Sequence, residues 1–243
     1  QDDHGVTATV QHDGHTEQIS ADWLVGCDGA GSTTRRLSDI AMGGPDALAR
    51  LVGIYFHADL GDIARQRPAI LYWTVDEQMP GTFITLDGRE RWVFHAPTDT
   101  ETFDPADYSP EQCREILQRA IGTDVDVDIR SVRPWVMTGQ VAERYRRGRV
   151  LLAGDAAHRF PPTGGYGMNT GIQDAHNLAW KLAMVTSGEA GQGLIDTYEH
   201  ERLPVAQGNA EWSVANAAGL DEVMGSGAQA QARRLAAGQV SFD

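Results

Sequence analysis

The sharpest change of hydrophobic pattern in the chain lies between residues 149 and 184. Residues 150–153 are all apolar, a run long enough for one buried strand. Residues 161–167 then bring two prolines and three glycines, which can continue neither a helix nor a strand. From residue 168 to 184, apolar side chains recur at helical spacing. The pattern predicts a strand, an acidic turn at Gly154-Asp155, a glycine-rich loop and a helix.

The rest of the chain predicts mostly short strands. Residues 6–10 alternate apolar and polar side chains, Asp13-Gly14 makes a turn, and residues 18–25 return as a second strand. A short helix near residues 32–37 follows, and Gly43-Gly44-Pro45 breaks the pattern. Further strand patterns cover residues 49–56, 69–75, 81–86, 91–95 and 125–136.

Two further helices are predicted. Ser109-Pro110-Glu111 supplies an N-cap, a proline at the first helical position and an acid in the first turn, which predicts a helix over residues 109–121. Residues 198–211 predict another, with Pro204 as either its kink or its start. Residues 219–243 are rich in Ala, Gly and Gln, and this composition fits either a helix or a loose tail.

These elements predict a mixed α/β fold with two interleaved units. Residues 1–46 and 148–205 contain the strand, turn and helix patterns and form one domain from two separate segments. Residues 47–147 are rich in alternating strands and form an inserted, mostly antiparallel sheet. Residues 206–243 form a C-terminal helical or loose segment.

Composition and charge exclude several classes of protein. The chain has 243 residues, of which 41% are hydrophobic, as in ordinary globular proteins. A net charge of −14 disfavours binding to nucleic acid or to an anionic membrane surface, because both would repel the protein. No apolar run approaches the roughly 20 residues of a membrane span. Two cysteines are too few for a disulfide framework and indicate a reducing compartment, which predicts a cytoplasmic protein.

The glycine-rich segment carries the first candidate chemistry. A helix that begins directly after such a loop exposes backbone N–H groups at its N-terminus, which suit an electron-rich or anionic ligand. Asp155 stands at the end of the preceding strand, and the loop at 161–167 contains no basic side chain. An acid in this place suits the hydroxyl groups of a ligand better than its phosphates.

Two motifs carry a resemblance to a known family. Residues 154–183 read GDAAHRFPPTGGYGMNTGIQDAHNLAWKLA, and residues 22–36 read DWLVGCDGAGSTTRR. Both closely resemble FAD-binding motifs of the flavoprotein aromatic hydroxylases, the p-hydroxybenzoate hydroxylase-like single-component monooxygenases. They occur in the family's order, and the resemblance covers residues 1 to 205. It implies a partial, Rossmann-like FAD-binding domain with an inserted sheet that holds the substrate against the flavin.

The resemblance also implies roles for individual residues. The Asp155 carboxylate would accept hydrogen bonds from the ribityl hydroxyls of FAD, and the backbone after the glycines would approach the flavin pyrimidine edge. Asp28 and Arg35 would contribute to binding the FAD pyrophosphate and NAD(P)H. The Pro162 carbonyl would lie near the flavin carbon that reacts with oxygen. The matching cofactor positions are Asp28, Gly29, Arg35, Gly154, Asp155, Pro162, Gly165, Gly167, Met168 and Asn169.

Neighbouring polar residues receive weaker interpretations. His158 follows the Gly-Asp-Ala-Ala run and is mainly structural in the family. Asp174 and His176 are two residues apart and do not share a helix face, so no metal site is predicted there. Tyr166 either closes over the flavin or fills space. The arginines between residues 144 and 149 are most simply a solvated turn, with a pyridine-nucleotide phosphate contact as the alternative.

The substrate is predicted to bind on the inserted sheet. Aromatic side chains on its strands suit a flat aromatic ligand, and half of them must point away from any one face. By register we expect Tyr72, Thr82, Ile84 and Trp92 to line the substrate pocket. Because no arginine stands clearly among these strand residues, a neutral phenol or polycyclic phenol is preferred to a benzoate.

The activity that the resemblance implies is aromatic hydroxylation. In this family NAD(P)H reduces FAD, the reduced flavin and O2 form a C4a-hydroperoxide, and an electron-rich phenolic ring attacks its distal oxygen. The alternatives are the same fold performing epoxidation, Baeyer–Villiger oxidation or halogenation. A halogenase would need a lysine near the flavin, and Lys181, inside a predicted helix, is the only lysine.

One element of the family pattern is absent from this sequence. No G-x-G-x-x-G turn for the FAD pyrophosphate precedes the two motifs, and the chain begins with Gln1 inside the hairpin pattern. We therefore expect a dinucleotide-binding segment upstream or on another chain. Without it, the remaining alternative is a fragment or subunit that binds no FAD and serves as a ligand-binding or structural module. Homo-oligomerisation and the choice between NADH and NADPH stay open.

Overall fold

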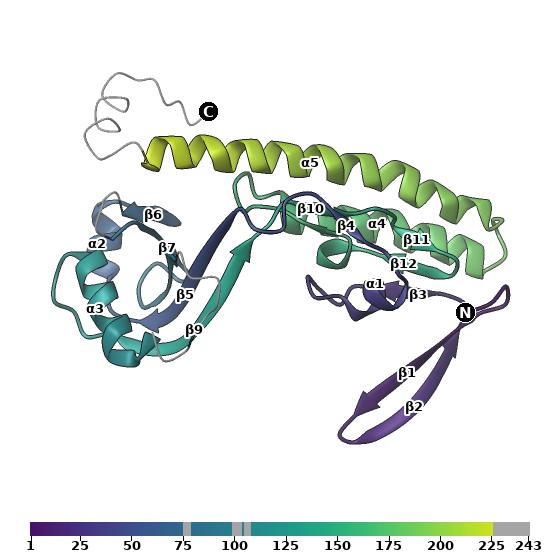
Figure 1. The fold of residues 1–243 in the computed structure, drawn as a ribbon, viewed down its shortest axis with the longest axis horizontal. Coiled ribbons are helices and arrows are strands. Elements are labelled where there is room, and N and C mark those ends of the chain that lie inside the picture. The colour runs from purple at the N-terminus through teal and green to yellow at the C-terminus, as the bar shows by residue number, and fades with distance from the viewer. Residues whose placement is uncertain (75–78, 99–103, 105–107, 226–243) are drawn as a thin grey trace. The chain divides into compact units, whose positions relative to one another are not determined.

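The computed structural model divides the chain into two compact units, which we describe separately (Figure 1). It describes residues 1–74, 79–98, 104 and 108–225. Residues 1–46 and 138–218 form the first unit, and residues 47–137 lie in the second. The predicted boundary at residue 147 falls ten residues too late, because β10 (Gln140–Ala142) pairs with β13 (His158–Arg159) and β4 (Met42–Gly43) of the first unit.

The first unit begins with an isolated hairpin. β1 (Val6–His12) pairs with β2 (His15–Ala21), and the register pairs His12 with His15. Asp13 and Gly14, the two loop residues, have φ of 47° and 77°, as a tight hairpin turn of matching twist requires. The predicted strand over residues 18–25 is wrong as one element. β2 ends at Ala21, and β3 (Leu24–Gly26) belongs to a different sheet.

A pair of parallel strands forms the centre of the first unit. β12 (Val150–Leu152) lies between β3, its parallel neighbour, and β11 (Arg146–Arg147), its antiparallel neighbour. Val150 is opposite Leu24 and Leu152 is opposite Gly26. Because the two strands run in the same direction, the segments that follow them leave the sheet at the same edge.

A short helix follows each strand of this pair, and two long helices complete the unit. α1 (Thr33–Leu37) follows β3, and the short 3₁₀ helix η2 (Gly154–Ala156) follows β12. α4 (Tyr166–Thr186) and α5 (Gly193–Gly225) are the long helices. α5 contains the predicted segment 198–211 but begins earlier, so Pro204 lies inside the helix rather than at its start. Of the C-terminal tail, residues 219–225 continue α5, and the rest lies outside the described residues.

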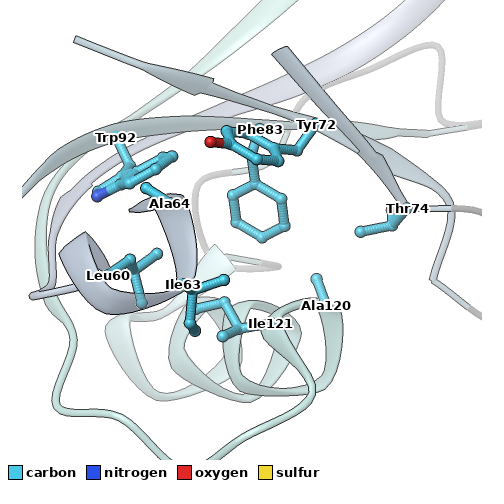
Figure 2. A pocket seen from close by; sticks show the side chains of 9 residues that line it. All are labelled: Leu60, Ile63, Ala64, Tyr72, Thr74, Phe83, Trp92, Ala120 and Ile121. Atoms are coloured by element: carbon cyan, nitrogen blue, oxygen red, sulfur yellow. The ribbon is translucent and has the colours of Figure 1, made fainter. Parts of the chain in front are cut away.

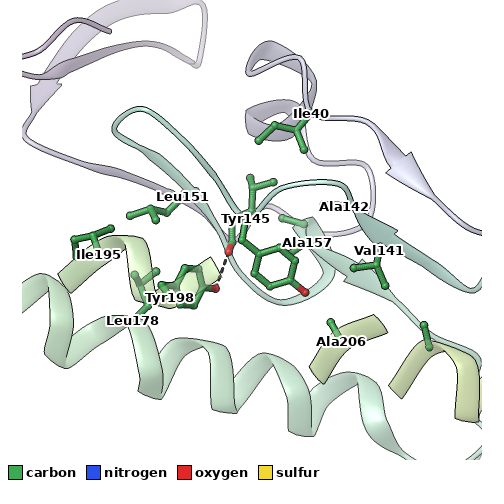
Figure 3. Close-up of a cluster of buried hydrophobic side chains, with 13 residues drawn as sticks. Ile40, Val141, Ala142, Tyr145, Leu151, Ala157, Leu178, Ile195, Tyr198 and Ala206 are labelled. Carbon is green, nitrogen blue, oxygen red and sulfur yellow. Dashed lines mark hydrogen bonds between the residues drawn. The ribbon is translucent and has the colours of Figure 1, made fainter. Parts of the chain in front are cut away.

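The core of the first unit joins α4 and α5 to the strands (Figure 3). Tyr145, Leu151, Ile195 and Tyr198 have no solvent exposure, and Leu178 of α4 packs with them. The Tyr198 hydroxyl donates a hydrogen bond of 2.7 Å to the carbonyl oxygen of Leu152. A polar group that is buried with a partner in this way fixes α5 against the end of β12.

The described residues of the second unit form an antiparallel sheet with two α-helices, and the alternating pattern predicts the sheet. Its strand order is β6-β7-β8-β5-β9, and alternate residues of β5 and β8 point into a core that also receives Leu117. Ser109 and Gln112 form a capping box at the start of the predicted helix, while the second, shorter helix is not evident in the sequence pattern. The elements are β5 (Ala49–His57), α2 (Gly61–Gln66), β6 (Leu71–Thr74), β7 (Gly81–Thr85), β8 (Arg91–Pro97), α3 (Pro110–Ile121) and β9 (Asp128–Met137).

We expect a methyl group at Gly81 to destabilise the second unit. A Cβ atom at this position would lie 2.3 Å from Cζ of Phe94 and 2.8 Å from the carbonyl oxygen of His95. Gly81→Ala should lower the free energy of unfolding by about 1–3 kcal/mol through overpacking. The matched control is Gly208→Ala in α5, where a Cβ meets open space; it should raise that free energy by up to about 1 kcal/mol. Urea denaturation followed by circular dichroism measures both, and equal effects would contradict this packing.

Candidate cofactor and substrate sites

The two sequence motifs meet at one edge of the parallel strands, and Arg35 connects them. Its guanidinium donates hydrogen bonds to the carbonyl oxygens of Ala30, at 3.4 Å, and Ala156, at 3.1 Å. The side chain is buried, and this burial lowers the pKa of the guanidinium. Arg35 therefore holds the Asp-Gly loop to the turn after β12, and its predicted contact with FAD or NAD(P)H stays a prediction.

Asp28 organises the Asp-Gly loop. Its carboxylate accepts hydrogen bonds from the Ser32 hydroxyl at 2.5 Å and from the Thr34 amide at 2.9 Å, at the start of α1. Partial burial acts to raise the pKa of Asp28, but these hydrogen bonds outweigh it and lower the pKa to about 2. Gly29 supplies the positive φ of 79° that the turn needs. The carboxylate positions this loop, and its direct contact with the cofactor remains a prediction.

The turn after β12 presents Asp155 to solvent. Asp155 is exposed, and within the described part of the chain no group hydrogen-bonds to its carboxylate. The neighbouring Gly154 has a φ of 61°, and a Cβ at Gly171 of α4 would lie 3.2 Å from the Gly154 Cα. This close backbone contact fixes η2 against α4 while Asp155 keeps its full capacity to accept hydrogen bonds.

The N-terminus of α4 has no side-chain cap. Its N-cap residue is Gly165, with φ of 67°, and Asn169 directs its side-chain amide back to the Gly165 carbonyl at 2.8 Å. No acid occupies the first turn. The Pro162 carbonyl accepts a hydrogen bond of 3.0 Å from the Gly165 amide, which closes the loop. The first N–H groups of α4 therefore have no side-chain cap, and their contact with an electron-rich ligand stays a prediction.

A buried acid beneath this turn was missed as a functional residue. Asp174 of α4 has no solvent exposure and accepts hydrogen bonds from His158 at 2.9 Å, from Arg202 at 2.8 Å and from the Gly154 amide at 3.3 Å. The signal was present in the sequence, because Asp174 stands at helical spacing from Thr170 and Leu178, on the buried face. His176, its neighbour in the motif, is exposed.

Three of the four arginines before β12 make contacts within the first unit, while Arg144 is exposed. Arg146 pairs with Asp196 and lies over the ring of Trp23, 5.1 Å from its centroid. Arg147 pairs with Asp39 at 3.1 Å, and Arg149 donates a hydrogen bond of 3.0 Å to the Asp22 carbonyl. These arginines join separate segments of the first unit, so nothing in their contacts favours a nucleotide phosphate.

Lys181 makes a structural contact between α4 and α5. Its side chain is fully buried, and its ammonium lies 2.8 Å from the Glu201 carboxylate of α5. That pairing lowers the pKa of Glu201 to about 2. The only lysine of the chain thus fastens α5 to α4, and its burial disfavours the lysine-dependent halogenase alternative.

The four predicted substrate residues do not share one face of the sheet. Tyr72 is opposite Phe83, and Trp92 is opposite Thr85, which puts Tyr72 and Trp92 on the face that α2 and α3 cover. Thr82 and Ile84 alternate with Phe83 along β7 and point to the other face. The prediction that all four line one pocket is therefore wrong, because alternation along each strand does not determine how β6, β7 and β8 are paired.

The face that carries Thr82 and Ile84 also carries aromatic and basic residues, and we call it the open face. His95 is opposite both Thr82 and Gly53, and its ring stacks on Trp135 with centroids 5.2 Å apart. Partial burial lowers the pKa of His95, which favours its neutral form. Arg133 is opposite Gly53 on the same face. The sequence pattern showed no arginine among the four predicted residues, and the pairing of β5 with β9 now adds Arg133 to the face of Thr82 and Ile84.

Neither a set of metal ligands nor a membrane-spanning helix is present among the described residues. No group of three or more His, Cys, Asp or Glu side chains gathers there as a set of metal ligands. In the same part of the chain, no helix combines the length and apolar character that crossing a membrane demands. Cys27 and Cys113 are both free thiols.

We expect Asp174 to dominate the stability of the first unit. Asp174→Asn removes the charge that faces Arg202 and leaves a buried guanidinium without its counter-ion. The free energy of unfolding should fall by about 3 kcal/mol or more, measured by urea denaturation. Asp155→Asn is the matched control, since its exposed carboxylate has no partner among the described residues, and should change that free energy by less than about 0.5 kcal/mol. A similarly small loss in Asp174→Asn would contradict the role of this network.

Comparison with known proteins identifies the family. A family model described as "FAD binding domain" matches residues 1–213. Tetracenomycin A2 monooxygenase-dioxygenase of Streptomyces glaucescens is 39% identical over 215 residues, covering 84% of this chain and 38% of that protein. 2,4-Dichlorophenol 6-monooxygenase of Cupriavidus pinatubonensis is 36% identical over 219 residues, covering 85% of this chain and 36% of that protein.

A solved structure agrees with these relatives. The flavin-dependent monooxygenase PieE, in complex with FAD and substrate, superposes with a TM-score of 0.84 at 34% identity, over 93% of this chain and 40% of that one. The chain thus spans between a third and two fifths of the length of the proteins it matches. The predicted fold class and the resemblance to flavoprotein hydroxylases are confirmed. The chain belongs to the FAD-binding domain family of the flavin-dependent monooxygenases.

Proposed function

We propose that this chain forms part of an NAD(P)H-dependent flavoprotein monooxygenase that hydroxylates a phenolic or polycyclic aromatic compound. One observation supports this more than any other. The Asp-Gly loop follows β3 and the Gly154-Asp155 turn follows β12, so both lie at one edge of these parallel strands. Asp155 has no partner among the described residues, and the N-terminus of α4 has no side-chain cap. Bound FAD would take electrons from NAD(P)H and deliver one atom of O2 to the ring, with the second leaving as water.

Different residues of the first unit would bind different parts of FAD. Asp155 would accept hydrogen bonds from the ribityl hydroxyls, since its oxygens have no partner among the described residues. The N–H groups after Gly165 would face the pyrimidine edge of the flavin. There the positive end of α4 would stabilise negative charge on the reduced ring by roughly 0.3–2 kcal/mol. The Pro162 carbonyl closes the loop that carries these groups.

We infer that the aromatic substrate lies on the open face of the second unit. This face combines apolar and aromatic side chains with a hydroxyl, an imidazole and a guanidinium, as a ring with polar substituents requires. Arg133 would hold the phenolic oxygen as its anion, which makes the ring more electron-rich. His95, with its lowered pKa, would accept the proton that leaves. The proposed lining is Trp73, Thr82, Ile84, His95, Arg133 and Trp135.

A further segment would complete the cofactor site. Among the described residues, β3 pairs with β12 alone, so its other edge is open to another strand. On α4, Met168 is 76% exposed and Ile172 is 60% exposed, and both lie on the outer stripe of the helix. These two features support a dinucleotide-binding segment, upstream or on another chain, as the partner of the first unit. The free thiols support a reducing compartment such as the cytoplasm.

The test of FAD binding uses the visible spectrum after adding FAD and desalting, followed by titration of flavin fluorescence. We expect the chain to retain flavin, and we expect Asp155→Asn to weaken the affinity roughly tenfold or more, because it removes charged hydrogen bonds. Asp22→Asn, another exposed acid, is the matched control and should leave the affinity unchanged. If the unaltered chain never holds FAD, either alone or with a supplied dinucleotide-binding segment, the ligand-binding or structural module becomes the better interpretation.

The substrate assignment is tested by NAD(P)H oxidation coupled to product formation. Phenols should be hydroxylated in preference to benzoates, and Arg133→Gln should shift the pH-rate profile for phenols to higher pH, since the guanidinium lowers the phenol pKa. Arg130→Gln is the control, because Arg130 pairs with Asp128 at 2.7 Å. Preference for benzoates, lost in Arg133→Gln, would instead identify a carboxylate clamp and overturn the phenol assignment.

A further inference from the structure

A second concave site lies within the second unit, on the face of the sheet opposite the open face (Figure 2). It is a cavity of about 160 Å³ between the strands β6, β7 and β8 and the helices α2 and α3. Its rim includes Ile63, whose side chain is 45% exposed. Nothing in the proposed hydroxylation uses this cavity. It is lined by Leu60, Ile63, Ala64, Tyr72, Thr74, Phe83, Trp92, Ala120 and Ile121.

The cavity exists because of a particular mixture of large and small residues. Tyr72, Phe83 and Trp92 form an aromatic wall on the sheet, with the rings of Tyr72 and Trp92 centred 5.9 Å apart. The opposite wall receives Ala64 from α2 and Ala120 from α3, where a leucine would fill the space. At this point α2 and α3 cover the sheet but leave the cavity between themselves and the strands.

The lining offers a guest apolar contact and almost no polar partner. The Trp92 indole N–H donates to the Arg89 carbonyl at 3.0 Å, and the Thr74 hydroxyl donates to the Met79 carbonyl at 2.8 Å. The Tyr72 hydroxyl accepts the Ala69 amide at 3.1 Å. None of the nine lining residues carries a charge. A charged or strongly polar molecule would lose its hydration here without compensation.

We propose that this cavity binds one small neutral aromatic molecule, a single six-membered ring with few substituents. An apolar protein cavity of about 150 Å³ is enough for benzene, and the cavity here has a similar volume. The aromatic wall favours a flat guest through edge and offset ring contacts. A polycyclic phenol exceeds this volume, so the cavity is distinct from the substrate site on the open face. The proposal does not depend on the proposed function.

Toluene is the probe, and methyl-resolved NMR of the intact 243-residue chain is the measurement. Toluene titrated into ¹³C-methyl-labelled protein should shift the methyl signals of Leu60, Ile63 and Ile121 by ring currents, with saturation at one equivalent. Methyl signals of the first unit, such as Ile195, should stay in place. Saturating toluene should also raise the melting temperature, because it binds the folded state alone.

Variants separate this site from general solubility of toluene in the protein. Ala64→Leu and Ala120→Leu each fill the cavity from a different helix and should abolish both the saturable shifts and the gain in melting temperature. If one of these two variants misfolds, the other still tests the proposal. Ala175→Leu on the exposed face of α4 is the matched control and should bind toluene as the unaltered chain does. Shifts that are absent, spread through both units, or unchanged in a folded cavity-filling variant would overturn the proposal.

Discussion

The parallel pairing of β3 with β12 is the constraint on which the cofactor region depends. The two strands come from distant parts of the chain, and their register puts Gly26 beside Leu152. Parallel strands deliver the segments that follow them to a common edge. The Asp-Gly loop and the Gly154-Asp155 turn therefore lie close together, and Arg35 donates a hydrogen bond to a carbonyl group on each side.

A charge buried behind that edge gives the turn its rigidity. Asp174 faces Arg202 and His158 in a place without solvent, so each partner removed would leave an uncompensated group. The same carboxylate holds the Gly154 amide, which ties the network to the backbone of the turn. The exposed acid that is proposed to meet the cofactor and the buried acid that supports the turn thus have separate roles. One requires an open environment, and the other requires a closed one.

The pleat of the sheet in the second unit gives its two faces different sets of side chains. Successive residues of β7 point to opposite sides, so Thr82 and Ile84 belong to the open face while Phe83 belongs to the core. The open face gathers an imidazole, an indole and a guanidinium, whereas the covered face gathers apolar rings whose polar atoms are already bonded. Polarity and size together are the grounds on which a phenol is proposed for one side and a plain ring for the other.

The sequence by itself determined most of the local elements and the kind of cofactor region. The glycine-rich loop, the capped helix at Ser109 and the alternating strands follow from backbone preferences and periodicity, which act over a few neighbouring residues. Tertiary structure alone decided which of these elements meet. Whether Tyr72 and Thr82 share a face depends on strand register, and whether Asp174 reaches His158 depends on how α4 packs on η2. Such contacts join residues far apart in the chain, and local pattern carries no information about that pairing.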